Sequence, residues 1–187
     1  MDNKQTALVV IDVQRGIMDD PGQTRVKEVH QEFDETVLRI RSLLDRARQA
    51  RIPVIYVQHD GVPGHRLEPH TLGWPIRAEI TPRPEEPVIH KRACDAFFET
   101  SLQEELAQRN VKRLVIAGCM TQYCIDTTVR RAVSLGYDVL LVADGHTTAD
   151  TPTLRFEQII AHHNAVLDGF DAGNHRVRVE RASGISF

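Results

Sequence analysis

The chain has 187 residues, 41% of them hydrophobic, and a formal net charge of −3. Its length suits one domain over residues 1–187 with a sizeable core, and its charge gives no electrostatic basis for binding nucleic acid or an anionic membrane surface. No apolar stretch approaches the roughly 20 residues that a membrane-spanning helix needs, so we expect neither nucleic acid nor a membrane as a partner.

Strand-like and helix-like segments alternate along the first half of the chain. Residues 1–5 lead directly into an apolar run at 7–11 without a secretion signal, so we expect a cytoplasmic protein. Apolar side chains then recur at helical spacing from Phe33 to Ala47, which predicts an amphipathic helix. A second strand is predicted at 53–57. A proline-rich excursion follows from about 60 to 87, and excursions of this length are usually functional.

The second half of the chain repeats this alternation. Strands are predicted at 88–90, 114–117 and 139–142, and a last strand at 176–179 is expected at a sheet edge. Helices are predicted around Leu102 and Leu106, from Ile125 to Gly136, and after Thr151-Pro152, which has the N-cap and N1 arrangement. Repeated βα units favour a parallel sheet covered by helices on both faces, so we predict an α/β fold with three α/β/α layers.

Three chemically active residues follow predicted strands: Asp12, Lys91 and Cys124. Because the carboxyl ends of parallel strands meet at one edge of a sheet, we expect these side chains to lie together. Burial would raise the pKa of Asp12 unless a cation were near, and Lys91 is the expected cation. Each residue also has a simpler interpretation: Asp12 could cap a turn, Lys91 could be solvated beside Arg92, and Cys124 could be a small buried side chain.

Cys124 is the expected nucleophile. If Thr121 is the N-cap of the helix that follows, Cys124 lies at the third helical position, where unpaired N–H groups and the helix dipole favour a thiolate. Cys119 at a strand end and Cys94 beside two phenylalanines are expected to be packing residues. Three cysteines without paired spacing argue against a disulfide framework or structural zinc, and fit a reducing compartment.

Several segments together resemble the isochorismatase-like cysteine hydrolases. They are Val10-Ile11-Asp12-Val13-Gln14, the Lys91 strand end, Val142-Ala143-Asp144, the helix after Thr151, and Gly118-Cys119-Met120-Thr121-Gln122-Tyr123-Cys124, which matches the Gly-x-x-Thr-x-x-Cys signature. The resemblance covers nearly the whole chain. It implies a six-stranded parallel sheet flanked by helices, assembled into homodimers or homotetramers.

The resemblance also implies a catalytic triad. Cys124 corresponds to the nucleophile, Asp12 to the general acid and base, and Lys91 to the cation that orients Asp12 and favours the thiolate. A cis peptide bond is implied between Cys119 and Met120, and the backbone N–H groups of Met120 and Cys124 are implied to form an oxyanion hole. Tentative substrate contacts are Gln14, His59, Trp74 and Tyr123, although Trp74 could equally belong to an oligomer contact.

Two departures from the family pattern bear on the pocket. Gly16-Ile17 stands where many relatives have Asp-Phe, so the pocket shape is expected to differ. Nicotinamidase relatives bind a metal through an Asp-x-His pair, whereas this chain has Gln58-His59-Asp60-Gly61. The spacing of His59, His65 and His70 also matches no ligand motif, so we expect neither a metal nor another cofactor.

These observations predict a cysteine-dependent hydrolase. Its substrate would be a small amide, carbamoyl or ureido compound, cleaved at a C–N bond through a thioester-type intermediate. One alternative is isochorismatase-type hydrolysis of a vinyl ether, which uses the carboxylate and the ammonium but not the thiol. A second alternative is a non-catalytic, oligomeric binding module built on the same fold.

Overall fold

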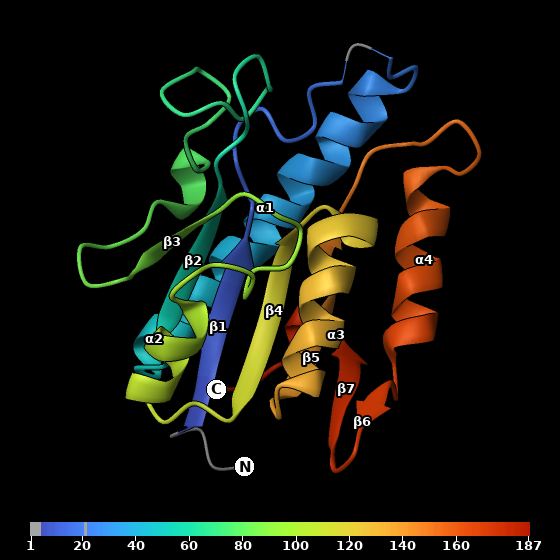
Figure 1. Cartoon of the computed structure of the whole chain (residues 1–187). Helices are drawn as coiled ribbons and strands as arrows, with labels where there is room; N and C mark the ends of the chain where they lie inside the picture. Colours follow the sequence, from blue (N-terminus) through green and yellow to red (C-terminus); the bar gives the residue numbers. More distant parts are fainter. Residues whose placement is uncertain (1–4, 21) are drawn as a thin grey trace.

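A seven-stranded sheet forms the centre of the computed structural model, which describes residues 5–20 and 22–187 (Figure 1). The strands are β1 Thr6–Ile11, β2 Val54–His59, β3 Val88–Lys91, β4 Arg113–Cys119, β5 Asp138–Thr147, β6 Asp171–Ala172 and β7 His175–Glu180. Across the sheet they follow the order β3-β2-β1-β4-β5-β7-β6. Residues 1–4, on which the expected absence of a leader depends, lie outside the described residues.

The sheet differs from the predicted six parallel strands by one added strand. β1, β2, β3, β4, β5 and β7 are parallel, as predicted, whereas β6 pairs antiparallel with β7. β6 has only two residues, Asp171 and Ala172, and the chain reverses through Gly173 at a φ of 64°. Such a short segment carries no hydrophobic run, so the sequence pattern does not reveal it.

Helices cover both faces of the sheet, which confirms the predicted α/β/α layers. The helices are α1 Val26–Gln49, α2 Leu102–Gln108, α3 Asp126–Ser134 and α4 Phe156–Leu167, with the short turns η2 Ala78–Ile80, η3 Thr121–Ile125 and η4 Ala182–Gly184. Figure 1 shows α1 behind the sheet, α2 and α3 in front of it, and α4 near the β7 edge. Among the helices in the described residues, none is both long and apolar enough to cross a membrane.

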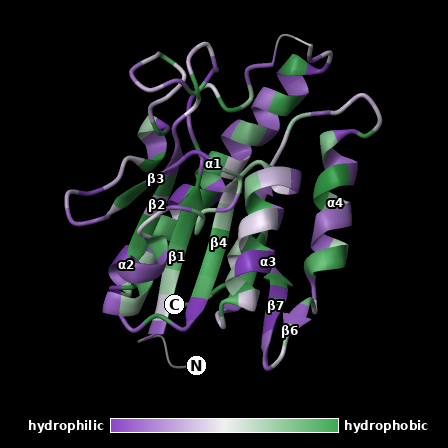
Figure 2. Cartoon of the chain, in the orientation of Figure 1, coloured by the Kyte–Doolittle hydropathy of each residue, from purple (hydrophilic) through white to green (hydrophobic). Residues whose placement is uncertain are grey.

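Alternate side chains of β1 enter two separate hydrophobic cores. Leu8 and Val10 pack in the core that contains α1, whereas Val9 and Ile11 pack in the core that contains α2 and α3. A strand buried on both faces has no polar side to present to water, and Figure 2 accordingly shows the central strands as mainly hydrophobic. This explains why the strands read as continuous apolar runs in the sequence.

Two predicted boundaries near the C-terminal half are wrong. α4 begins at Phe156 and not after Thr151, because the Thr151 Oγ1 accepts a hydrogen bond from the Leu154 N–H at 3.0 Å and closes a separate turn. β5 continues past Val142 to Thr147 through a register shift opposite β4, between Ile116 and Gly118. The shift interrupts the side-chain alternation, which is why the apolar pattern stops before the strand does.

The register of the sheet brings the candidate site residues to one edge. Ile11 at the end of β1 pairs with Val57 of β2 and with Gly118 of β4. His59 at the end of β2 pairs with Lys91 at the end of β3. The carboxyl ends of these four strands therefore lie side by side, and the segments that leave them meet above the sheet.

Gly118 lies against the backbone of β1 at this edge. Its φ is +134°, and a Cβ at this position would overlap the carbonyl oxygen of Ile11. The strand that leads to the signature segment therefore needs a residue without a side chain, for both conformational and steric reasons.

We expect Gly118→Ala to destabilise the fold strongly. The substitution adds a backbone overlap to an unfavourable φ, and should lower the free energy of unfolding by about 3 kcal/mol or more. Gly169→Ala is the matched control, because Gly169 has a φ of +81° but nothing near its Cβ position, so it should cost only about 1–2 kcal/mol. Urea unfolding of both variants measures the difference, and equal losses would contradict the steric argument.

Candidate active site

The Lys91 ammonium is the centre of a buried three-way contact. Its Nζ lies 2.6 Å from Asp12 Oδ2 and 3.1 Å from Cys124 Sγ, and it donates to the Ala93 carbonyl oxygen at 2.9 Å. An ammonium has three N–H donors, so all three are used. Asp12 is 1% exposed, Lys91 2% and Cys124 9%. The structure therefore brings together the three side chains that the sequence predicts to meet.

Asp12 is held in an unusual backbone conformation directly after β1. Its φ is +52°, and its N–H donates to the Val57 carbonyl oxygen at 2.9 Å. Within the described part of the chain, its buried Oδ1 has no hydrogen-bond partner. Backbone strain and an unpartnered buried oxygen both cost free energy, and both are concentrated at functional sites.

Charge interactions set the ionisation of the three groups. Burial raises the pKa of Asp12 well above its usual range, the charge on Cys124 adds to this, and Lys91 opposes it. Burial disfavours the Lys91 ammonium, but Asp12 and Cys124 together raise the pKa of Lys91 above its usual value. The site therefore holds a permanent ammonium, and a proton on Asp12 is compatible with negative charge on sulfur.

Cys94 is a fourth member of this site, and its predicted role as a packing residue is wrong. Its side chain is exposed. Interaction with the Cys124 side chain, with help from Lys91, lowers the pKa of Cys94 to about 6. The interaction with Cys94 and burial raise the pKa of Cys124, while Lys91 lowers it. The Lys91 ammonium thus favours negative charge on both sulfurs, and the interaction between the two thiols favours that charge on Cys94.

The segment between β4 and α3 carries Cys124 in a tight turn. The peptide bond between Cys119 and Met120 is cis, as predicted. Thr121 is not the N-cap of the helix: the N-cap is Met120, and residues 121–125 form the π-helical turn η3, which contains Cys124. Cys119 is fully buried, in agreement with its predicted packing role.

A buried hydrogen-bonded chain supports this turn from behind. The Thr121 Oγ1 lies 2.9 Å from His146 Nδ1, and His146 Nε2 lies 2.9 Å from Asn164 Oδ1. Burial lowers the pKa of His146 to about 4, so the ring is neutral and one nitrogen accepts while the other donates. The sequence gives no signal for this contact, because His146 lies beyond the predicted end of its strand.

Gln14, a predicted substrate contact, instead braces two loops. Its side chain is fully buried, and its Nε2 donates to the carbonyl oxygens of His59 at 3.0 Å and Trp74 at 2.8 Å. Its Oε1 accepts from the His59 N–H at 2.9 Å. These contacts use both N–H donors of the amide group and one acceptor position of its oxygen.

Trp74 packs in a polar cluster at the rim of the site. Its Nε1 donates to Asp60 Oδ1 at 2.8 Å, and its ring stacks on the His90 ring with centroids 5.8 Å apart. Asp60 Oδ1 also lies 3.0 Å from His90 Nδ1. His90 was not among the predicted site residues, because nothing in the sequence shows that it shares a carboxylate with Trp74.

Two further polar side chains approach the site from the β2 side. His59 Nδ1 and Arg66 Nε are buried without a hydrogen-bond partner among the described residues. Burial and the charge of Lys91 lower the pKa of His59 to about 4. An Arg66 terminal nitrogen lies 3.6 Å from Met120 Sδ, beside the cis peptide. Tyr123, another predicted contact, is 50% exposed.

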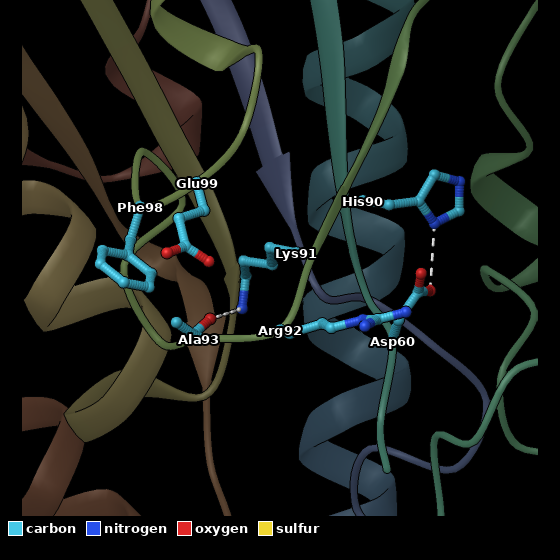
Figure 3. Close-up of a pocket in the computed structure, with 7 residues that line it drawn as sticks. All are labelled: Asp60, His90, Lys91, Arg92, Ala93, Phe98 and Glu99. Carbon is cyan, nitrogen blue, oxygen red and sulfur yellow. Dashed lines mark hydrogen bonds and ion pairs between the residues drawn. The ribbon is translucent and has the colours of Figure 1, made fainter.

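A cavity of about 380 Å³ opens beside Lys91. Figure 3 shows its lining residues: Asp60, His90, Lys91, Arg92, Ala93, Phe98 and Glu99. This volume lies within the range of small-molecule sites, and the walls combine an aromatic ring with both signs of charge. No group of three or more potential metal ligands from His, Cys, Asp and Glu is found among residues 5–20 and 22–187.

Comparison with known proteins identifies related sequences. Residues 6–168 match the isochorismatase domain family. A streptothricin hydrolase from Streptomyces noursei is 38% identical over 146 residues, which cover 78% of this chain and 51% of that protein. A second streptothricin hydrolase from that organism is 36% identical, with 78% and 56% covered. This chain therefore spans about half the length of these two relatives.

A more distant relative and a solved structure extend the comparison. The ureidoacrylate amidohydrolase RutB from Agrobacterium fabrum is 26% identical, with 75% of each chain covered. The crystal structure of an isochorismatase from Pseudomonas putida KT2440 matches with a TM-score of 0.84 and 30% identity, and the match covers 99% of this chain and 92% of that one.

The buried histidine predicts a pH dependence of stability. The folded chain keeps His146 neutral down to pH about 4, whereas an unfolded histidine takes up a proton near pH 6.5. The contribution of His146 to stability is therefore complete above pH 6.5 and is lost as the pH falls towards 4. His146→Gln should reduce the slope of the unfolding free energy between pH 6 and 5 by up to about 1.4 kcal/mol per pH unit. Urea unfolding across this range tests it, and equal slopes would contradict it.

Proposed function

The chain belongs to the isochorismatase family, and from this premise we propose that it is a cysteine-dependent hydrolase of a small amide, carbamoyl or ureido compound. The observation that carries the proposal is the buried Lys91 ammonium, which contacts both the Asp12 carboxylate and the Cys124 sulfur. Two relatives support the reaction class, since one is named a hydrolase and the other an amidohydrolase.

The first step generates the nucleophile. The Cys124 proton passes to Asp12 Oδ1, the oxygen without a hydrogen-bond partner, and the thiolate stays beside Lys91 Nζ. The raised pKa of Asp12 suits it to hold this proton. The thiolate then attacks the carbonyl carbon, and the C=O electron pair moves onto oxygen. Backbone N–H groups of Met120 and Cys124 would receive this oxyanion, each worth about 10²–10³-fold in rate.

The second half of the reaction returns the site to its starting state. Asp12 gives its proton to the substrate nitrogen, the C–N bond breaks, and the amine leaves a thioester on Cys124. Asp12 then removes a proton from water, the hydroxyl group attacks the thioester carbon, and the C–S bond breaks. The acid leaves, and the Cys124 thiolate beside Lys91 takes the proton back from Asp12. One amide and one water thus become one acid and one amine.

The cavity beside Lys91 supports a small-molecule substrate. Among the described residues, His59 offers a buried nitrogen without a partner. Trp74 donates to Asp60 at the cavity wall, and Tyr123 precedes Cys124, so we keep these three as proposed substrate contacts. Phe98 at the cavity is 54% exposed and Tyr123 50%, which supports the proposal that a second copy of the chain covers them in a homodimer or homotetramer. The reaction needs a reduced thiol, which favours a reducing compartment such as the cytoplasm.

Vinyl ether hydrolysis is the second candidate. Its supporting observation is that Asp12 and Lys91 form a complete acid and cation pair without the sulfur, and Asp12 has a raised pKa. A protonated Asp12 is able to protonate a vinyl carbon directly. The two candidates differ in whether Cys124 is needed.

We expect Cys124→Ser to abolish amide turnover without loss of the fold. A screen of small amides, carbamoyl compounds and ureas, read by ammonia or acid release, should find a substrate for the unmodified chain. Loss of the nucleophile should lower kcat by about 10⁴-fold or more. Circular dichroism checks the fold.

Cys119→Ala is the matched control, because it removes a buried thiol from the strand that leads to Cys124 without touching Lys91, and it should keep turnover. Full activity of Cys124→Ala would instead favour vinyl ether chemistry. A chain that binds small molecules but turns over none of them, amides, ureas or vinyl ethers, would be a binding module.

A further inference from the structure

The loop after β3 is attached to the helix that follows Cys124. The Thr128 Oγ1 donates to the Cys94 carbonyl oxygen at 3.3 Å and accepts from the Ala96 N–H at 3.1 Å. Thr128 lies four residues beyond Cys124, so it occupies the next turn of the same helical segment. The backbone of Cys94 is thereby fixed one turn away from the Cys124 side chain.

Lys91 provides a second attachment between the loop after β3 and the segment that contains Cys124. Its Nζ contacts both the Ala93 carbonyl oxygen and the Cys124 sulfur, so the residue before Cys94 and the sulfur of Cys124 are held by one atom. Each of the two side chains also shifts the pKa of the other, as neighbouring thiols do. Two fixed points in the backbone therefore hold Cys94 beside Cys124.

The two thiols differ in their access to solvent. Cys94 is exposed, whereas Cys124 is 9% exposed. The neighbouring residues Lys91, Arg92 and Ala93 line the cavity, so a small solute reaches this loop from outside (Figure 3). The low pKa of Cys94 makes its sulfur a thiolate at neutral pH, which is the form that oxidants attack.

We propose that Cys94 and Cys124 form a reversible intramolecular disulfide when the protein meets hydrogen peroxide. Peroxide transfers an oxygen to the exposed Cys94 sulfur, which gives Cys94–SOH and one water. The Cys124 sulfur then attacks the Cys94 sulfur, the S–O bond breaks, and a second water leaves with the Cys124 proton. The two thiols lose two electrons and two protons in total, and peroxide is reduced to two waters.

This disulfide would inactivate the site reversibly. The nucleophilic sulfur is no longer available for attack, and neither sulfur is left as a thiolate that peroxide can oxidise further to the irreversible sulfinic state. A dithiol reductant restores both thiols. Cys94 would therefore act as an oxidant-reactive partner that protects Cys124.

The direct experiment is peptide mapping of the full chain after treatment with hydrogen peroxide. Free thiols are alkylated, the chain is digested with trypsin, and a linked pair of peptides, 93–109 and 114–130, is expected at two hydrogens below their summed mass. Cys119 lies in the same peptide as Cys124, so the digest is repeated with Cys119→Ala, in which the link should persist. A link through Cys119, or a link between two chains, would overturn the proposal.

Reversibility is tested with Cys94→Ser. After the same treatment, dithiothreitol should restore the Cys124 thiol of the unmodified chain, whereas Cys94→Ser should retain at least tenfold more Cys124 as sulfinic or sulfonic acid. Equal irreversible oxidation in the two proteins would overturn the protective role. Neither readout needs a substrate, so a failure here is distinct from a failure of the proposed hydrolase function. The linked peptide in the unmodified chain stands even if the variant folds poorly.

Discussion

The burial of one ammonium group controls the rest of this structure. An uncompensated cation in a protein interior is too costly to persist, so Lys91 requires partners on all three of its N–H donors. Asp12, Cys124 and the Ala93 carbonyl supply them. Each partner comes from a different part of the chain. The register of the sheet therefore has to bring the carboxyl ends of β1, β3 and β4 to one edge. The left-handed backbone at Asp12 and the glycine at position 118 are consequences of that close approach.

The same charge arrangement links the proposed catalysis to the proposed oxidation chemistry. Around Lys91, a carboxyl group and two sulfurs lie close enough for the charge on one to shift the pKa of another, so that protons are redistributed among them. A carboxyl group that holds a proton easily is a good general acid, and a sulfur that loses one easily is a good nucleophile or oxidation site. Cys94 thus extends the site towards solvent, while the Thr121–His146–Asn164 chain supports it from the interior.

The sequence pattern predicted the parts of the fold that are long and buried on both faces. The strands that carry Asp12 and Lys91 were recognisable because a fully buried strand must be apolar throughout. The two-residue β6 and the continuation of β5 to Thr147 were missed, because a very short strand and a register shift leave no periodic signal. The side chain of Thr121 suits a helix cap, yet His146 competes for the same hydroxyl group.

The sequence by itself determined which chemical groups stand at the strand ends, since apolar runs that stop at Asp12 and Lys91 leave those groups at the sheet edge. Cys124 was expected from its place after a predicted strand, and the family resemblance added the cis bond between Cys119 and Met120. Only the tertiary structure decided what each side chain contacts. It placed Gln14 where its side chain braces two loops, and it placed Cys94 beside Cys124, because hydrogen-bond partners distant in the sequence are chosen by packing and register, which no local pattern encodes.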